Sequence, residues 1–432
     1  MSQTRPASLG PTVGRWRPGS YTELEEAAAG GLLDESHWVE LKGDLPAGNP
    51  GANAELARDL ASLAPDGGLL VVGVKDAVRE PGAVVGVQLS KLADRIDAVA
   101  RTRIDRPLTV RTRELHDPDR PGFGCLLVEV PASPLAPHMA EGSYWGRSDR
   151  AKIRLDDAQV RRLHEQLQQQ HIDIDAALDA LRADDPISAE ARGLSHLYVV
   201  VHPVTANATA LDPLLDADDG HARLLTLAKA AAGRVPASPK GFSPDLRSPT
   251  QWRGHADGRL LTTRYERLGE TESVREASLV DLVIRSDGGL ALTCGRGTDV
   301  VRPRWRPING EDPEETMVVL PQILLGLTCG TAQLAGLLAD EVSGYQGSWQ
   351  VGVLIDRLRG VVPHEAVQHH GDIGQAFNRD EYSRATITTT DELVNGPAAV
   401  AERATKPLLV ALGIERLHLP YGSDREPAAD EA

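Results

Sequence analysis

The sequence predicts a mixed α/β protein with two folded domains. Its 432 residues exceed the size at which a single hydrophobic core keeps growing. Apolar runs of strand length alternate with amphipathic segments of helical period, and polar stretches separate them. Hydrophobic residues make up 41% of the chain and charged residues 25%, which is the composition of a folded globular protein.

The N-terminal part predicts one mixed-sheet domain over residues 21–167, preceded by a flexible lead-in at residues 1–20 that is rich in Pro, Gly, Arg and Ser. The apolar run 69–74 has the length and composition of a buried strand, and Leu56, Leu60 and Leu63 share one face of a helix capped by Asn53. The other elements expected from periodicity are helices at 21–33, 89–100 and from 160, and strands at 38–42, 108–114, 125–130 and 142–147.

The C-terminal part predicts a second α/β domain over residues 191–420, of no recognisable family. Residues 168–190 are expected to form a linker or helix, and residues 421–432 a disordered tail. The expected strands are 196–204, 259–265, 277–285, 288–293 and 348–355, and the expected helices are 222–232, 315–342 and 398–412. The apolar stripe on the helix at 315–342 is interpreted as core or as a subunit interface.

Charge and cysteine content exclude several classes of protein. A net charge of -16 excludes a protein that coats nucleic acid by bulk electrostatics. The acidic excess lies mainly after residue 165, so a local basic surface on the N-terminal part remains open. Three separated cysteines without a C-x-x-C spacing exclude a disulfide scaffold and a conventional zinc finger. With no apolar leader and no uninterrupted membrane-spanning run, we expect a cytoplasmic protein without a membrane partner.

The most informative residues for chemistry surround the strand at 38–42. Glu40 and Lys42 are two residues apart and share one strand face, Glu35 lies just before them, and Asp76 follows the next strand. If these side chains converge, three carboxylates and an amine form a cluster suited to phosphodiester hydrolysis. Carboxylate oxygens are the ligands that Mg²⁺ or Mn²⁺ prefers. The alternative is a solvated strand face and an ordinary turn aspartate.

The order of five segments resembles the Schlafen-type Alba-like domain family. These segments are 35–42, the helix end at 66–68, the strand 69–76, the pair at 85–86, and 137–148 with its aromatic and arginine. The resemblance implies a nucleic-acid-binding domain, and for the better-understood relatives a metal-dependent endoribonuclease acting on tRNA or other structured RNA. It maps an acidic triad onto Glu35, Glu40 and Asp76, which would hold the metal ion, and a catalytic lysine onto Lys42.

Two basic groups could position nucleic acid. The first contains Arg101, Arg103 and Arg106, but Asp97 and Asp105 lie among them and could neutralise it. The second group contains Arg147, Arg150, Lys152 and Arg154, and Tyr144 beside it could stack on an unpaired base.

We therefore expect a nucleic-acid-binding protein and candidate metal-dependent ribonuclease, with a possible role in defence or stress by analogy alone. The resemblance also implies a homodimer. One alternative is a non-catalytic regulator that binds DNA or RNA. Another is an ATP-binding protein, as some relatives have been labelled, although the sequence has no G-x-x-x-x-G-K-[ST] loop.

Overall fold

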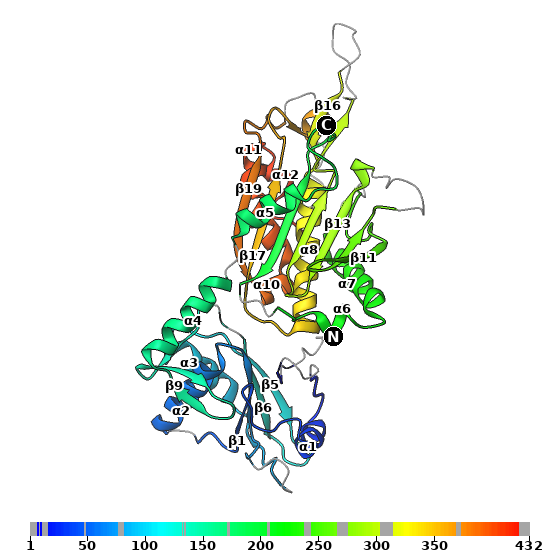
Figure 1. Ribbon diagram of the computed structural model, residues 1–432. Coiled ribbons are helices and arrows are strands. Elements are labelled where there is room, and N and C mark those ends of the chain that lie inside the picture. The colour runs from blue at the N-terminus through cyan, green and yellow to red at the C-terminus, as the bar shows by residue number, and fades with distance from the viewer. Residues whose placement is uncertain are drawn as a thin grey trace, which may run out of the picture. The chain divides into compact units, whose positions relative to one another are not determined.

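The computed structural model describes residues 7, 9–10, 16–46, 49–76, 82–131, 133, 135–170, 173–204, 208–236, 243–265, 275–302, 314–368 and 373–422. The chain divides into two compact units. Unit 1 comprises Met1–His171 and Ala339–Ser348, and unit 2 comprises Ile172–Leu338 and Trp349–Ala432. Both units combine helices with sheets, which confirms the predicted mixed α/β class (Figure 1).

The predicted linker and tail only partly fall on described residues. Residues 174–183 of the expected linker form the helix α5 (Ile174–Ala183), which belongs to unit 2. Of the expected disordered tail, residues 423–432 lie outside the described residues.

Unit 2 is built on a seven-stranded sheet with the strand order β11-β12-β13-β14-β10-β17-β19. The strands of this sheet are β10 (Leu197–Pro203), β11 (Gln251–His255), β12 (Gly258–Thr262), β13 (Val280–Arg285), β14 (Leu290–Cys294), β17 (Ser348–Ile355) and β19 (Tyr382–Thr389). A separate three-stranded sheet consists of β15 (Thr298–Val301), β16 (Thr316–Val319) and β18 (Val362–Pro363). Besides α5, its helices are α6 (Asp212–Leu215), α7 (Gly220–Arg234), α8 (Pro321–Leu338), α9 (His364–Gln368), α10 (Thr390–Asn395), α11 (Pro397–Ala411) and α12 (Glu415–His418), with a 3₁₀ turn, η1 (Glu276–Ser278).

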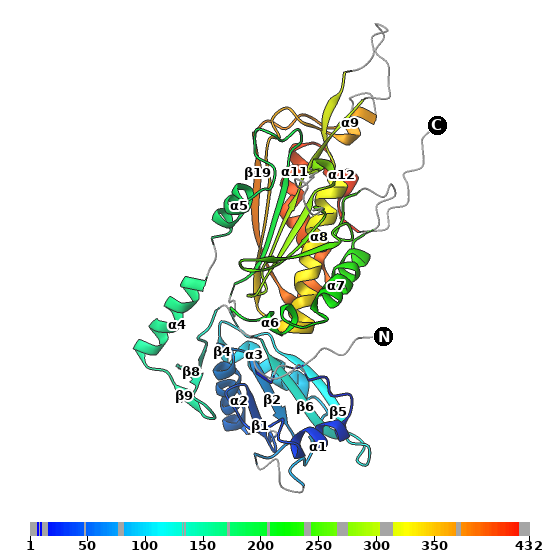
Figure 2. The same ribbon diagram turned by 45° about the vertical axis from the view of Figure 1, so that its right-hand side comes forward.

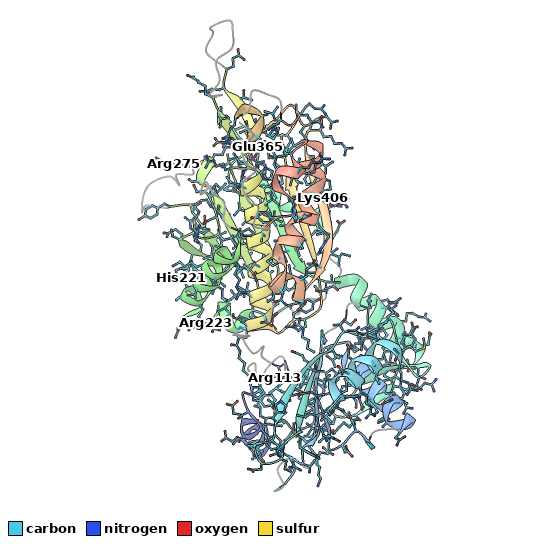
Figure 3. The ribbon with its side chains drawn as sticks, turned by 180° about the vertical axis from the view of Figure 1, so that it is seen from behind. Arg113, His221, Arg223, Arg275, Glu365 and Lys406 are labelled. Carbon is cyan, nitrogen blue, oxygen red and sulfur yellow. The ribbon has the colours of Figure 1, made fainter. Side chains whose placement is uncertain are left out.

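Helices cover both faces of this sheet. Helix α5 packs on one face against Tyr198 and Leu354, whereas α7, α8 and α11 lie behind the other face (Figure 2). Every residue of β10 is buried in consequence, which explains why its sequence reads as a continuous apolar run. The outer surfaces of the covering helices are polar, as exposed Arg223 on α7 and Lys406 on α11 show (Figure 3).

The long apolar helix predicted at 315–342 is shorter in the structure. Residues 316–319 form β16, which pairs with β15 and β18, and α8 begins only at Pro321. The helical run Pro321–Ser343 is long and apolar enough to cross a membrane, but 89% of its most apolar window is buried, as expected for a core helix. Its leucine stripe is buried inside unit 2 against α7, α10 and α11, so it does not support the predicted homodimer.

Unit 1 contains two small sheets. In the first, β1 pairs in parallel with β2, β2 pairs with β6, and β6 also pairs with β3 and β5; the second has the order β4-β7-β8-β9. The strands are β1 (Val39–Lys42), β2 (Gly68–Val72), β3 (Val87–Gln88), β4 (Ile104–Asp105), β5 (Arg111–His116), β6 (Phe123–Val130), β7 (Met139–Ala140), β8 (Ser143–Arg147) and β9 (Lys152–Arg154). The helices are α1 (Tyr21–Ala29), α2 (Pro50–Leu63), α3 (Leu92–Thr102) and α4 (Asp157–Gln170), with a π-helical turn, η2 (Ala339–Ser343).

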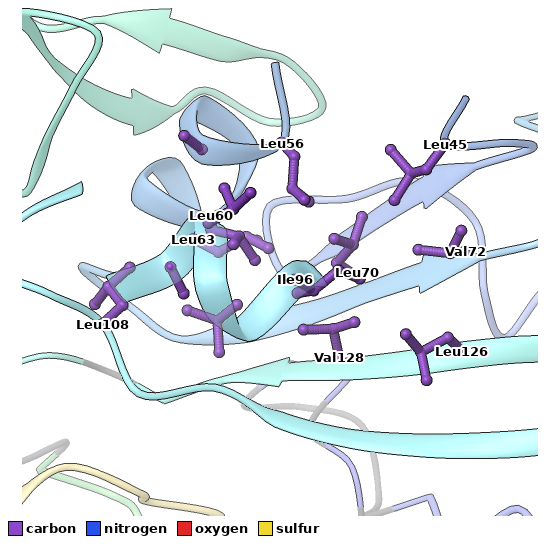
Figure 4. Packing of buried hydrophobic residues seen from close by; sticks show 14 of the residues in the cluster. Leu45, Leu56, Leu60, Leu63, Leu70, Val72, Ile96, Leu108, Leu126 and Val128 are labelled. Carbon is purple, nitrogen blue, oxygen red and sulfur yellow. The ribbon is translucent and has the colours of Figure 1, made fainter. Parts of the chain in front are cut away.

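The core of unit 1 forms where α2 and α3 cover one face of the first sheet. Leu56, Leu60 and Leu63 of α2 are buried against Leu70 on β2 and Ile96 on α3 (Figure 4). The predicted stripe on α2 is therefore confirmed.

The cap predicted for α2 at Asn53 is wrong. The helix starts one turn earlier, because Asn49 Oδ1 accepts a hydrogen bond from Gly51 N at 2.9 Å and Pro50 suits the first turn.

The opposite face of this sheet packs against α1 and the start of the chain. Leu69 and Val71 of β2 lie in a second cluster with Leu24. Ala7 and Leu9, two described residues of the predicted flexible lead-in, are buried in the same cluster.

Candidate functional site

Strand β1 turns two charged side chains toward the face of the sheet that α2 covers. Val39 and Leu41 are buried in the α1-side cluster, and Glu40 and Lys42 share the other face, as strand alternation requires. Glu40 Oε1 accepts a hydrogen bond from Lys42 Nζ, and Glu40 Oε2 accepts one from Arg147 Nη1 at 2.7 Å. The Arg147 side chain is only 1% exposed, so this ion pair is internal.

Helix α2 supplies two more carboxylates to the same place. Glu55 and Asp59 are four residues apart and therefore lie on one side of the helix. Asp59 Oδ1 is 2.6 Å from Lys152 Nζ, and Asp59 Oδ2 is 3.4 Å from Lys42 Nζ. Glu55 also pairs with Lys152. We call these six residues the unit 1 charge cluster: Glu40, Lys42, Glu55, Asp59, Arg147 and Lys152.

The pKa values in this cluster reflect a balance between burial and pairing. Burial alone would raise the pKa of Glu40, but hydrogen bonds and charges from Lys42 and Arg147 outweigh it and the pKa is lowered. Burial and the charge of Glu40 raise the pKa of Asp59, against the opposing charges of Lys42 and Lys152. Burial would lower the pKa of Lys42, but the charges of Asp59 and Glu40 raise it.

The cluster and its neighbours fasten the β8–β9 hairpin, residues 143–154, to the domain. Arg147 Nη2 donates to Ser36 O at 3.1 Å, and Arg58 on α2 lies 5.6 Å from the ring centre of Trp145. His37 Nδ1 is 3.3 Å from Ser148 O in the hairpin turn. A hydrogen bond between His37 Nε2 and Asp66, 2.8 Å long, raises the pKa of His37.

The predicted acidic triad is brought only part of the way together. Glu35 lies just before β1, where its Oε1 accepts a hydrogen bond from Leu41 N at 3.4 Å. Burial raises the pKa of Glu35, and the negative charges of Glu40 and Asp76 raise it further, so the three carboxylates are electrostatically coupled. Asp76 is exposed after β2.

This arrangement does not fit a divalent metal site. Within the described ranges, no group of three His, Cys, Asp or Glu side chains lies close enough to hold a metal ion. Both carboxylate oxygens of Glu40 are taken by Lys42 and Arg147. Mg²⁺ or Mn²⁺ would have to displace a buried ion pair to reach Glu40. The metal-binding role of Glu35, Glu40 and Asp76 remains a prediction from the sequence.

The predicted nucleic-acid-binding residues divide into paired and unpaired groups. Arg147 and Lys152 belong to the unit 1 charge cluster, so they are turned inward and are not surface cations as expected. Arg101 pairs with Asp97 at 3.0 Å, as the alternative for the first group predicted, whereas Arg103 pairs at 3.0 Å with Glu141, which that alternative did not name. Arg106, Arg150 and Arg154 are exposed and form no ion pair with any other described residue.

Strand register separates the predicted stacking residue from the basic side chains. Trp145 pairs with Arg154 and Arg147 with Lys152, so these four side chains share the face toward α2. Tyr144 lies on the opposite face of β8 and is half-buried. The expected single patch of arginines and Tyr144 is therefore spread over two faces of the hairpin.

Sequence reasoning missed Glu55 and Asp59, the carboxylates that hold Lys152. A signal was available: Asp59 interrupts the apolar face of a helix at a position where its neighbours Leu56, Leu60 and Leu63 are all core residues. A charged residue in such a stripe requires an ionic partner when it is buried. The Asp59 side chain is 0% exposed.

Unit 2 contains its own buried charged group. His196 Nδ1 is 2.7 Å from Asp185 Oδ2 and Nε2 is 3.0 Å from Glu276 Oε1. Arg192 Nη1 donates to Asp356 Oδ2 and to Tyr198 Oη, each at 2.8 Å. We call these residues the unit 2 charge cluster: Asp185, Arg192, His196, Tyr198, Glu276 and Asp356.

The fold and the site define unit 1 as a small α+β domain with a charged strand edge. Residues 35–156 match the model of the family described as "Schlafen, AlbA_2". This part of unit 1 is therefore a Schlafen AlbA_2 domain, which confirms the resemblance and supports a nucleic-acid-related function. The family match does not extend into the C-terminal part.

Other comparisons add little. The comparison with curated proteins finds no match. Among solved structures, the chain is similar to the crystal structure of the DIP2311 protein from Corynebacterium diphtheriae, with 18% identity and a TM-score of 0.22. The similarity covers 46% of this chain and 30% of that protein's length.

Proposed function

We propose that unit 1 binds nucleic acid, with RNA as the first choice, through the β8–β9 hairpin. The observation that carries this proposal is the exposure of Arg150 and Arg154 without a carboxylate partner in the described chain. Neighbouring charged residues such as Arg147 and Lys152 are neutralised internally, so these two arginines stand out as available cations. Guanidinium groups of this kind bind phosphate oxygens and set the register of a nucleic acid without reading its sequence.

Local electrostatics explain how an acidic protein could do this. A net charge of -16 opposes non-specific association, so binding depends on a few well-placed arginines. Each phosphate contact steepens the fall of log K with log salt concentration by about 0.9 for a duplex and about 0.7 for a single strand. Two arginine contacts predict a shallow but measurable salt dependence.

The test is fluorescence anisotropy of labelled tRNA with the full chain. The double variant Arg150→Glu/Arg154→Glu is expected to abolish binding and to flatten the salt dependence. Arg223→Glu is the matched control, because Arg223 is an exposed arginine on α7 of unit 2 without an ion pair among the described residues. Equal affinity of wild type and the double variant would reject the hairpin as the binding surface.

RNA cleavage is the second candidate function. What supports it is the raised pKa of Glu35, which is caused first by burial and then by the nearby charges of Glu40 and Asp76. A carboxyl group with a raised pKa holds a proton closer to neutral pH and can serve in general acid–base catalysis. Incubation of total tRNA with Mg²⁺, Mn²⁺ or EDTA tests this candidate, with Glu35→Gln as the variant because Glu35 lies outside the unit 1 charge cluster. Intact RNA in every lane would reject it.

A further inference from the structure

The first strand of the β8–β9 hairpin pairs with β7 and packs Trp145 on the core, and charged side chains hold both strands of the hairpin. Its turn contributes a backbone contact, Ser148 O, which lies 3.3 Å from His37 Nδ1. On the first strand Arg147 reaches Glu40, and on the second Lys152 reaches α2. Arg150 lies in the turn of the hairpin and Arg154 ends β9, and both are exposed. Their positions therefore depend on the clamp, that is, on the contacts of Arg147 and Lys152 that hold the hairpin.

We propose that Asp59 is a positioning residue for nucleic-acid binding, acting through Lys152 to hold the arginines of the hairpin in place. The inference rests on the proposed function of the hairpin. It assigns Lys152 an internal role, although its place in a basic run suggests a direct contact with phosphate.

Geometry favours the internal role of Lys152. Its side chain is 20% exposed, and its ammonium group lies 2.6 Å from Asp59 and also pairs with Glu55. A lysine with two carboxylate partners is already neutralised, and its transfer to a phosphate would leave the buried Asp59 with only the longer ion pair to Lys42, at 3.4 Å. Phosphate contacts therefore fall to the unpaired arginines.

Asp59 is the central carboxylate of this clamp. It lies between Lys42 on β1 and Lys152 on β9, and thereby joins the first sheet, helix α2 and the hairpin. Glu55 shares Lys152 but is 42% exposed, so water replaces part of its effect. Neutralising Asp59 should loosen the hairpin without removing any cation that faces solvent.

The experiment compares the full-length variants Asp59→Asn, Lys152→Met and the double variant. The readouts are tRNA affinity as a function of salt and hydrogen exchange of the amide groups at residues 143–154. Each single variant is expected to weaken binding about tenfold, and the double variant no further, because both changes break one interaction. The salt slope should stay unchanged, and the hairpin amides should exchange faster.

Asp117→Asn is the matched control. Asp117 pairs with Arg120 at 2.7 Å on the loop between β5 and β6 and contacts no hairpin residue in the described chain. Affinity and hairpin exchange should equal those of the wild type. If Asp59→Asn does not fold, Lys152→Met carries the test, since Asp59 then keeps Lys42 as a partner.

Three results would overturn the proposal. If the fall of log K with log salt concentration is shallower by about 0.7–0.9 in Lys152→Met than in the wild type, Lys152 contacts a phosphate directly. Additive losses in the double variant would show that the two residues act separately. Unchanged hairpin exchange in Asp59→Asn would show that the clamp does not hold the hairpin. If wild-type protein binds no nucleic acid, the proposed function fails, whereas hairpin exchange still decides whether Asp59 positions this segment.

Discussion

The two charge clusters differ in their access to water. In the unit 1 charge cluster, Lys42 is 23% exposed, Lys152 20% and Glu55 42%. In the unit 2 charge cluster, the His196 and Asp185 side chains are 0% exposed and Arg192 5%. The first cluster borders solvent at three of its six members, whereas in the second only Glu276, at 21%, is comparably exposed.

This contrast shows how burial sorts charged groups into roles. Ion pairs at the rim are screened by water and salt, so the loss of one partner costs less there than in a buried pair. A fully buried ion pair contributes little to the net free energy of unfolding while both partners are present. Removal of one partner destabilises the fold strongly, because the other charge stays buried without compensation. The predictions below test whether the two clusters behave in these two ways.

The largest effect is expected from Arg192→Met in unit 2. The substitution leaves Asp356 without its arginine partner, and should lower the stability of unit 2 by about 3–5 kcal/mol. Hydrogen exchange of β10 and β17 measures this loss without assuming that the two units unfold together. If the free energy of unfolding of unit 2 falls by less than about 1 kcal/mol, this ion pair behaves as a solvent-exposed one, which contradicts the expectation.

A smaller loss is expected from Lys152→Met in unit 1. Asp59 keeps Lys42 at 3.4 Å and water reaches the rim, so the expected destabilisation of unit 1 is about 1–2 kcal/mol. Hydrogen exchange of β1 and α2 provides the measurement. If Lys152→Met lowers stability as much as Arg192→Met does, the two charge clusters do not differ in the cost of losing one partner.

Acidification should act on the unit 2 charge cluster through Asp185. Burial would raise the pKa of Asp185, but its hydrogen bond and ion pair with His196 lower it below the ordinary value of 3.8. Its contribution to stability is therefore present above the unfolded-state pKa and is lost as pH falls through the folded-state pKa. Asp185→Asn should flatten the loss of unit 2 stability between about pH 5 and pH 2; parallel curves for variant and wild type would contradict the assignment.

The smallest effect is expected from Glu35→Gln beside the unit 1 charge cluster. The pKa of Glu35 is raised above its ordinary value of 4.5, so its ionisation at neutral pH opposes folding. This penalty is absent below the unfolded-state pKa and develops as pH rises through the folded-state pKa. Glu35→Gln should therefore stabilise unit 1 at pH 7 by a few tenths of a kcal/mol, and not at pH 4. Denaturant titrations at both pH values check the sign.

Local pattern predicted much of the fold. The stripe of Leu56, Leu60 and Leu63 and the apolar run of β2 identify themselves because burial imposes their periodicity. The strands expected at 277–285 and 288–293 correspond to β13 and β14, which pair antiparallel. The strand at 316–319 was missed, because four apolar residues before a helix carry no signal that separates strand from helix.

The site was less predictable, because its contacts join distant positions. Glu40 and Lys42 were recognised as a local pair, and the structure places them in contact. The partner of Glu40 is Arg147, 107 positions away, and the partner of Asp59 is Lys152, 93 positions away. A single sequence shows that these residues are charged, but only the fold decides whether each cation faces an internal carboxylate or solvent.

The segment Ala339–Ser348 belongs to unit 1 although it follows most of unit 2 along the chain. Within it, Gln346 accepts a hydrogen bond from the side chain of Arg111 on β5. During synthesis, unit 1 therefore stays incomplete until the ribosome has passed residue 348, when the strands of unit 2 up to β16 have already emerged or are emerging. An expressed fragment ending at His171 would lack this segment and leave Arg111 without Gln346.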